Sequence, residues 1–132
     1  MAYWGEALTF AQLLWGLDYA DSARTALTKL GPTTEARLAK AGSARERQYG
    51  AAVEALFAPS DLPTRVRGCI AGLRTLTSAY PHDLEARALL AGVTAAERER
   101  HNRGTARDVS GASRTEATLA VNWHSADRER GR

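Results

Sequence analysis

Apolar side chains recur every three or four residues along the first hundred positions, which is the period of an amphipathic helix. The first stripe, between residues 2 and 15, consists of Trp4, Leu8, Ala11 and Trp15. The same spacing, interrupted by glycine and proline, predicts further helices over residues 18–30, 34–41, 43–57, 61–80 and 83–92, and a short polar helix from Thr94. Because Ala, Arg, Leu and Glu greatly outnumber strand-favouring Val, Ile and Phe, the sequence predicts an all-α fold.

Several predicted helix starts carry residues that cap helices. Ser43 and Glu46 have S-x-x-E spacing, in which each side chain can satisfy a backbone N–H near the other residue. The remaining candidate caps are Asp18 or Asp21, Ser60 or Asp61, Asp83, and Thr94 with Glu97.

Helical periodicity ends at about Gly104. Residues 104–132 are rich in Gly, Ser, Thr, Asn and charged side chains, a composition typical of disordered segments. The net charge of +3 belongs to residues 98–132, where eight arginines stand against five acids, whereas residues 1–97 are neutral. We therefore expect antiparallel helical hairpins over residues 1–97 and a polar, Arg-rich, disordered tail over residues 98–132.

Composition limits the class of protein. Of the 132 residues, 44% are hydrophobic and 25% are charged, which is ordinary for one soluble domain. One cysteine excludes an intramolecular disulfide, and no apolar run reaches the roughly 18–20 residues of a membrane-spanning helix. The chain opens without the basic segment of a signal peptide, so we expect a cytoplasmic location.

Candidate chemistry is sparse. Cys69 lies on the apolar side of its predicted helix, which favours a buried structural role over a nucleophile. His82, Asp83 and Glu85 stand together at one helix start, where capping and compensation of the helix dipole explain the acids without a metal. The sequence thus predicts no catalytic residue, metal site or cofactor, and it favours a protein that is not an enzyme.

The first eight residues, Met1-Ala2-Tyr3-Trp4-Gly5-Glu6-Ala7-Leu8, are similar to the start of a helix in a bacterial group of tetratricopeptide-repeat (TPR) proteins. Each unit of such a repeat is a pair of antiparallel helices that ends in proline. Cys69, Leu73 and Leu76 stand 12, 8 and 5 residues before Pro81, close to the repeat pattern, with Leu76 where a small residue is usual. A degenerate match precedes Pro32, where Ala20 and Leu27 fit and Arg24 replaces a large apolar residue.

This resemblance covers about residues 1–97, and it implies a short TPR-like array that docks other proteins without catalysis. In the similar proteins another helix precedes and covers the first motif, so here Trp4, Leu8 and Trp15 are expected to be partly exposed and to bind a second copy or another protein. Arginines near helix starts are expected to pair with acids such as Glu46 and Asp61 or to face an acidic partner, and the candidates for binding are Arg45, Arg65 and Arg67.

Two other interpretations stay open. Arg100, Arg103 and Arg107 form a row that could contact a nucleic-acid backbone, although interleaved acids and the near absence of lysine disfavour it. The chain could also be a remnant of a longer TPR protein without an independent function, because it begins inside a helix motif and loses periodicity abruptly. The preferred partner is a protein or peptide, with no membrane contact.

Overall fold

Helices are the only secondary structure in the part of the chain that the structure describes. This computed structural model describes the backbone of residues 2–11 and 19–130, and side chains only as far as Asp108. The elements are α1 (Ala2–Thr9), α2 (Ala20–Thr28), α3 (Thr34–Leu38), α4 (Ala44–Leu56), α5 (Leu62–Ala79) and α6 (Leu84–Arg130). The predicted all-α class is therefore confirmed for the described residues. The second half of the predicted first helix, with Trp15, lies outside them.

The predicted caps explain where three helices begin. Ser43 Oγ accepts the backbone N–H of Glu46 at 3.1 Å, and Asp61 Oδ1 accepts that of Thr64 at 2.8 Å. Asp83 does the same for α6, where Oδ1 lies 3.1 Å from the N of Ala86. The Glu46 carboxylate accepts the N–H of Gly42 at 2.8 Å, one residue before the cap. Near α2, by contrast, the N-cap is Tyr19, which makes no side-chain capping bond.

The predicted break after residue 92 is wrong, because α6 is continuous through Gly92 and Thr94. Val93 and Ala96 are buried, so burial continues on one side of the helix across the supposed boundary. Nothing lies within 4 Å of the position that a Cβ on Gly92 would take, so this glycine is an ordinary helix-interior residue on an open side.

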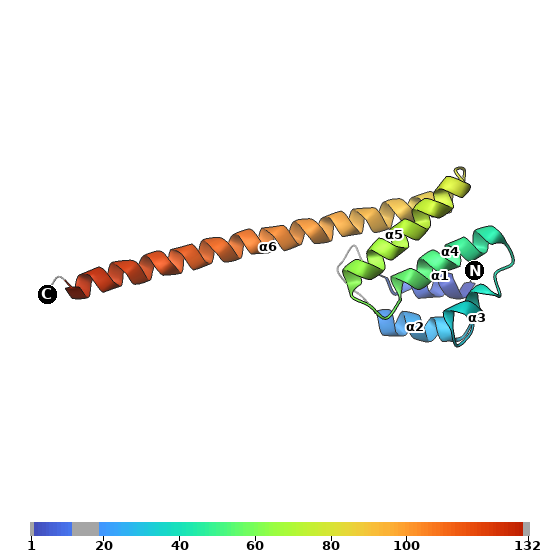
Figure 1. Ribbon diagram of the computed structural model, residues 1–132, viewed down its shortest axis with the longest axis horizontal. Coiled ribbons are helices and arrows are strands. Elements are labelled where there is room, and N and C mark those ends of the chain that lie inside the picture. Colours follow the sequence, from blue (N-terminus) through green and yellow to red (C-terminus); the bar gives the residue numbers. More distant parts are fainter. Residues whose placement is uncertain (1, 12–18, 131–132) are drawn as a thin grey trace. The chain divides into compact units, whose positions relative to one another are not determined.

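α4 and α5 form the main antiparallel hairpin, and glycines on α5 let the two helices approach closely (Figure 1). A Cβ on Gly72 would lie 3.0 Å from the Cβ of Ala52, and a Cβ on Gly68 would lie 3.3 Å from that of Ala55. The two glycines therefore stand where α4 and α5 are in close contact. α4 also contacts α1 and α3, and α1 contacts α2.

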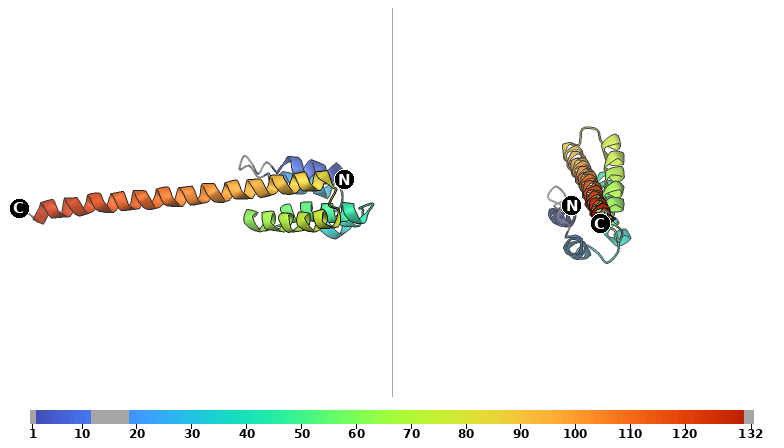
Figure 2. Two further views of the ribbon diagram at one scale, coloured as in Figure 1. Left: turned by 90° about the horizontal axis from the view of Figure 1, so that it is seen from above. Right: turned by 90° about the vertical axis from the view of Figure 1, so that its left-hand side faces the viewer.

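One hydrophobic core joins these helices to the first turns of α6. Figures 1 and 2 show α5 and the start of α6 side by side and antiparallel, joined by the turn at residues 80–83. The largest fully buried side chains are Trp4, Leu56, Leu73, Leu76, Val53, Val66 and Cys69. Ala86 and Val93 of α6 belong to the same cluster. Burial of these side chains is the main stabilisation of the fold.

The chain divides into two units, Met1–Arg98 and Glu99–Arg132. In the second unit the backbone is helical as far as Arg130. The described side chains from His101 to Asp108 are all exposed, in agreement with the absence of an apolar stripe. Within this unit Glu99 and Arg103, one helical turn apart, form an ion pair at 3.6 Å. Among the described residues, no helix is long and apolar enough to cross a membrane.

Candidate protein-interaction site

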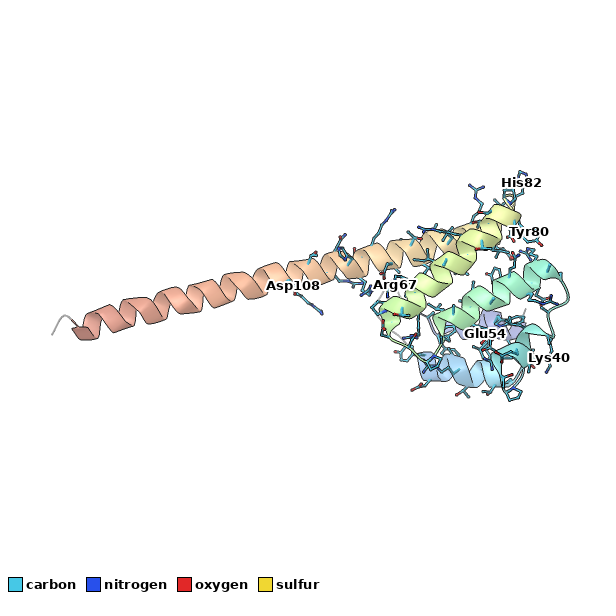
Figure 3. All side chains as sticks on the ribbon, in the orientation of Figure 1. Lys40, Glu54, Arg67, Tyr80, His82 and Asp108 are labelled. Atoms are coloured by element: carbon cyan, nitrogen blue, oxygen red, sulfur yellow. The ribbon has the colours of Figure 1, made fainter. Side chains whose placement is uncertain are left out.

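A buried polar cluster ties α1, α3 and α4 together. The Glu54 carboxylate of α4 accepts hydrogen bonds from Arg37 Nε at 2.7 Å and Nη2 at 2.6 Å, a two-point contact typical of strong Arg–carboxylate pairs. Trp4 Nε1 donates to the same carboxylate at 3.1 Å, and Arg37 Nη1 donates to the Gly31 carbonyl at 2.9 Å. Glu54 and Arg37 keep only 6% and 10% of their side-chain surface exposed. In Figure 3, Glu54 lies among the helices.

The Arg37 and Glu54 side chains stabilise each other's charged forms. Burial by itself raises the pKa of Glu54, but hydrogen bonds from Arg37 and Trp4 outweigh it and the pKa falls below 4.5. The hydrogen bond to Glu54 raises the pKa of Arg37 against the opposing effect of burial. This charged cluster therefore has a structural role, because its hydrogen-bonding groups already bind one another or a backbone carbonyl of the protein.

The expectation that Trp4 is partly exposed is wrong, since its exposed fraction is 1%. The indole is covered by α4, a later helix. A Cβ on Gly50 would lie only 2.7 Å from the indole Cζ2, so the ring rests directly on this glycine. Leu8 is half-buried against the core, and Trp15 lies outside the described residues. Trp4 is thus a core residue, and burial of this side chain removes it from any docking surface.

Arg65 also faces inward. It is 5% exposed, and its Nη1 donates to the Leu56 carbonyl at 3.2 Å at the end of α4. Arg24 donates to the next carbonyls, from Nε to Phe57 at 2.9 Å and from Nη2 to Ala58 at 3.1 Å. Two cations therefore occupy the negative end of the α4 dipole, which explains Arg65 as a structural residue and corrects its assignment to a binding surface.

Arg45 and Arg67 lie at the surface. Arg45 Nε contacts Asp83 Oδ2 at 2.5 Å and its Nη2 contacts Glu85 at 3.4 Å, so acids do hold this arginine, although they come from the α6 start and not from Glu46. The hydrogen bond from Arg45 lowers the pKa of Asp83. Arg67 is exposed and donates to Thr64 Oγ1 at 3.1 Å (Figure 3). Of the predicted binding residues, Trp4 and Arg65 are thus buried, and Arg45 and Arg67 lie at the surface.

An open groove that the sequence does not reveal lies between the end of α5 and the first turns of α6. It has a volume of about 610 Å³, within the range of ligand-binding clefts. Its lining consists of Thr77, Pro81, Arg87, Leu90, Ala91, Thr94, Ala95 and Arg98. Six of these residues belong to α6 and recur every three or four positions, so they form one stripe beside the buried stripe of the same helix.

Arg87 and Arg98 stand at the two ends of this groove. Both are exposed, and within the part of the chain that the structure describes neither guanidinium forms a hydrogen bond or an ion pair. Arg24, Arg37 and Arg45 differ, because each is engaged by carbonyls or carboxylates. The groove lining contains no acid. The groove thus has an apolar floor between two arginines whose guanidiniums can bind a partner.

The sequence pattern does not predict the groove, because the helix break expected after residue 92 assigns Arg87 and Arg98 to two different helices. A helical wheel drawn without that break places the two arginines on one face with Leu90, Ala91 and Thr94 between them. Nothing in such a wheel shows that α5 leaves this face open.

A second cavity of about 460 Å³ lies between α2, α3 and α4, over the buried ion pair. Its polar lining includes Arg24, Arg37 and Glu54. The guanidiniums of both arginines already donate to carbonyls or to the carboxylate, so this cavity presents few unused donors. No group of three or more His, Cys, Asp or Glu side chains with metal-binding geometry occurs among the described residues.

Burial raises the pKa of the Cys69 thiol to about 12. We expect the folded protein to react with a thiol reagent at neutral pH about a hundredfold more slowly than the urea-unfolded chain, because the thiol is fully buried and protonated. Mass spectrometry of the time course measures this directly, since Cys69 is the single cysteine. Equal rates in the folded and unfolded chains would contradict the buried position.

Comparison with known proteins found no match to a protein family, to a curated protein or to a solved structure.

Proposed function

We propose that the chain is a non-catalytic protein-interaction scaffold, which docks a peptide or a helix of a partner on the surface of its helical hairpins. The observation that carries this proposal is the open groove between α5 and α6, with its apolar floor and unengaged arginines. A helix laid in such a groove buries apolar surface and gains specificity from the polar groups at the rim. The TPR resemblance of residues 1–97 supports the same function at the level of architecture.

Among the described residues, the positions of the other ionisable groups support a non-catalytic role. The best-placed nucleophile, Cys69, is buried with a raised pKa, and the carboxylates of Glu54 and Asp83 are held by arginines in structural contacts. Enzymes instead bring titratable groups together in an accessible cleft. The alternative of nucleic-acid binding by the tail has less support, because Arg103 in the predicted row already pairs with Glu99.

Selection of helical peptides from a displayed library on the immobilised full chain tests this function. The selected peptides are expected to perturb amide resonances of Leu90, Ala91 and Ala95 in the isotope-labelled protein. The substitution Ala91→Glu, on the groove floor, should weaken their binding about tenfold or more, because it fills the groove with a charged side chain.

Ala88→Glu is the matched control. Ala88 is exposed on the same helix but does not line the groove, so the control should change affinity less than about twofold. Failure to select any helical peptide would contradict the scaffold function. Peptides that bind equally well to both variants would show that the groove is not the docking site.

A further inference from the structure

The charges around the groove indicate the chemistry of its partner, an inference that rests on the proposed function. Arg87 and Arg98 are eleven residues apart on one helix, which is three turns, or about 16 Å along the axis. Between them lie the side chains of Leu90, Ala91 and Ala95. A partner that matches this arrangement has acidic groups separated by about three helical turns and aliphatic side chains between them.

From this geometry we infer that the α5–α6 groove binds an acidic amphipathic helix of another protein. Within the described part of the chain no acid pairs with the cations at the groove ends, since the lining contains none and α5 contains no Asp or Glu. Two acids, Glu97 and Glu99, flank Arg98 in the sequence, but Glu99 pairs with Arg103 and neither forms an ion pair with Arg98 among the described residues. An acidic helix supplies the missing counter-charges, and its aliphatic face covers the floor.

A second copy of this chain fits the groove less well. If two copies paired through the same stripe in antiparallel orientation, Arg87 of each would meet Arg98 of the other, and like charges at an interface are unfavourable. Nucleic acid also fits poorly, because the floor is aliphatic, the lining offers only two cations and no aromatic side chain is present for base stacking. Charge and apolarity together favour the acidic helix.

The test uses the full chain and a synthetic helical peptide with two glutamates three turns apart on one face and leucines between them. A second peptide carries lysines in place of the glutamates. At low ionic strength the acidic peptide should bind at least about tenfold more tightly than the basic one, and added salt should reduce that preference. Calorimetry or fluorescence anisotropy of the labelled peptides gives both affinities.

Charge reversal locates the interaction. The double substitution Arg87→Glu and Arg98→Glu should weaken the acidic peptide about tenfold or more and strengthen the basic one. The control is the double substitution Arg47→Glu and Arg107→Glu, which changes the net charge by the same amount. Both arginines are exposed and lie outside the groove. These control changes should alter either affinity less than about threefold.

Each outcome decides the inference. Equal weakening by the groove and control variants would show general attraction to a basic protein and would overturn the inference. Equal or tighter binding of the basic peptide, or no binding of either, would also overturn it, whereas the proposed function would still stand if library peptides map to the groove and respond to Ala91→Glu. Tighter binding of a duplex oligonucleotide that depends on Arg87 and Arg98 would replace the acidic helix by nucleic acid.

Discussion

The substitution Glu54→Leu should lower the free energy of unfolding by about 3–5 kcal/mol, because it leaves the buried guanidinium of Arg37 without its carboxylate. Trp4 Nε1 and Thr34 Oγ1 lose the same acceptor. Urea unfolding followed by circular dichroism measures the change. The control Asp108→Leu, at an exposed position of α6, should change stability by less than about 0.5 kcal/mol.

Removal of both the Arg37 and the Glu54 charge tests whether the loss of stability in Glu54→Leu comes from the unpaired guanidinium or from lost side-chain packing. In the double variant Arg37→Met with Glu54→Leu no uncompensated charge remains, so its loss of stability should be smaller than that of Glu54→Leu alone. Losses that add up for the two single variants would contradict coupling between the side chains.

The Glu54→Leu effect should also depend on pH. The pKa of Glu54 is lower in the folded protein than its ordinary 4.5, so the carboxylate contributes stability above pH 4.5 and loses that contribution as the pH falls through its lowered value. The difference between the natural chain and Glu54→Leu is therefore expected to shrink in acid. An unchanged difference down to strongly acidic pH would contradict the lowered pKa.

Gly50→Ala should destabilise the protein by about 1–3 kcal/mol although alanine is the better helix former. The added Cβ would stand 2.7 Å from Cζ2 and 2.8 Å from Cε2 of Trp4, and 3.1 Å from a methyl of Leu38. The indole has to move, and its hydrogen bond to Glu54 lengthens or breaks. Chemical denaturation reports the stability, and indole-proton resonances report the hydrogen bond.

Gly92→Ala is the matched control, since it is the same substitution inside a helix. No atom lies within 4 Å of the new methyl group at that position, so helix propensity acts alone and the variant should gain about 0.5–1 kcal/mol. Opposite signs for the two substitutions would support the contact between Trp4 and Gly50. A stabilising Gly50→Ala would show that the indole does not rest on this glycine.

Local features of the fold are predictable from the sequence because their causes are local. The caps formed by Ser43, Asp61 and Asp83 each act within three residues, and the apolar stripes follow the helical period. The extent of α6 is not predictable in this way, because S/T-x-x-E spacing at Thr94 competes with continued burial at Val93.

The roles of particular side chains depend on partners far along the chain. Glu54 reaches Arg37 across 17 residues and Trp4 across 50, and no spacing rule connects them. The sequence alone likewise favours an exposed position for Arg65 at a helix start. In the structure its guanidinium donates to a carbonyl at the end of α4. The groove needs both the length of α6 and the position of α5, so it emerges only from the arrangement of the helices in space.

α4 lies at the centre of the first unit, since α1, α3 and α5 all contact it. Linear repeat arrays can often be shortened by whole hairpins, because each hairpin mainly touches its neighbours. Here, deletion of the first hairpin, α1 and α2, would expose the Glu54 carboxylate and Gly50, which the Trp4 indole contacts. It would also expose the apolar side chains of α4 around them. The amino-terminal hairpin is therefore an integral part of one cooperative structure and cannot be treated as a detachable module.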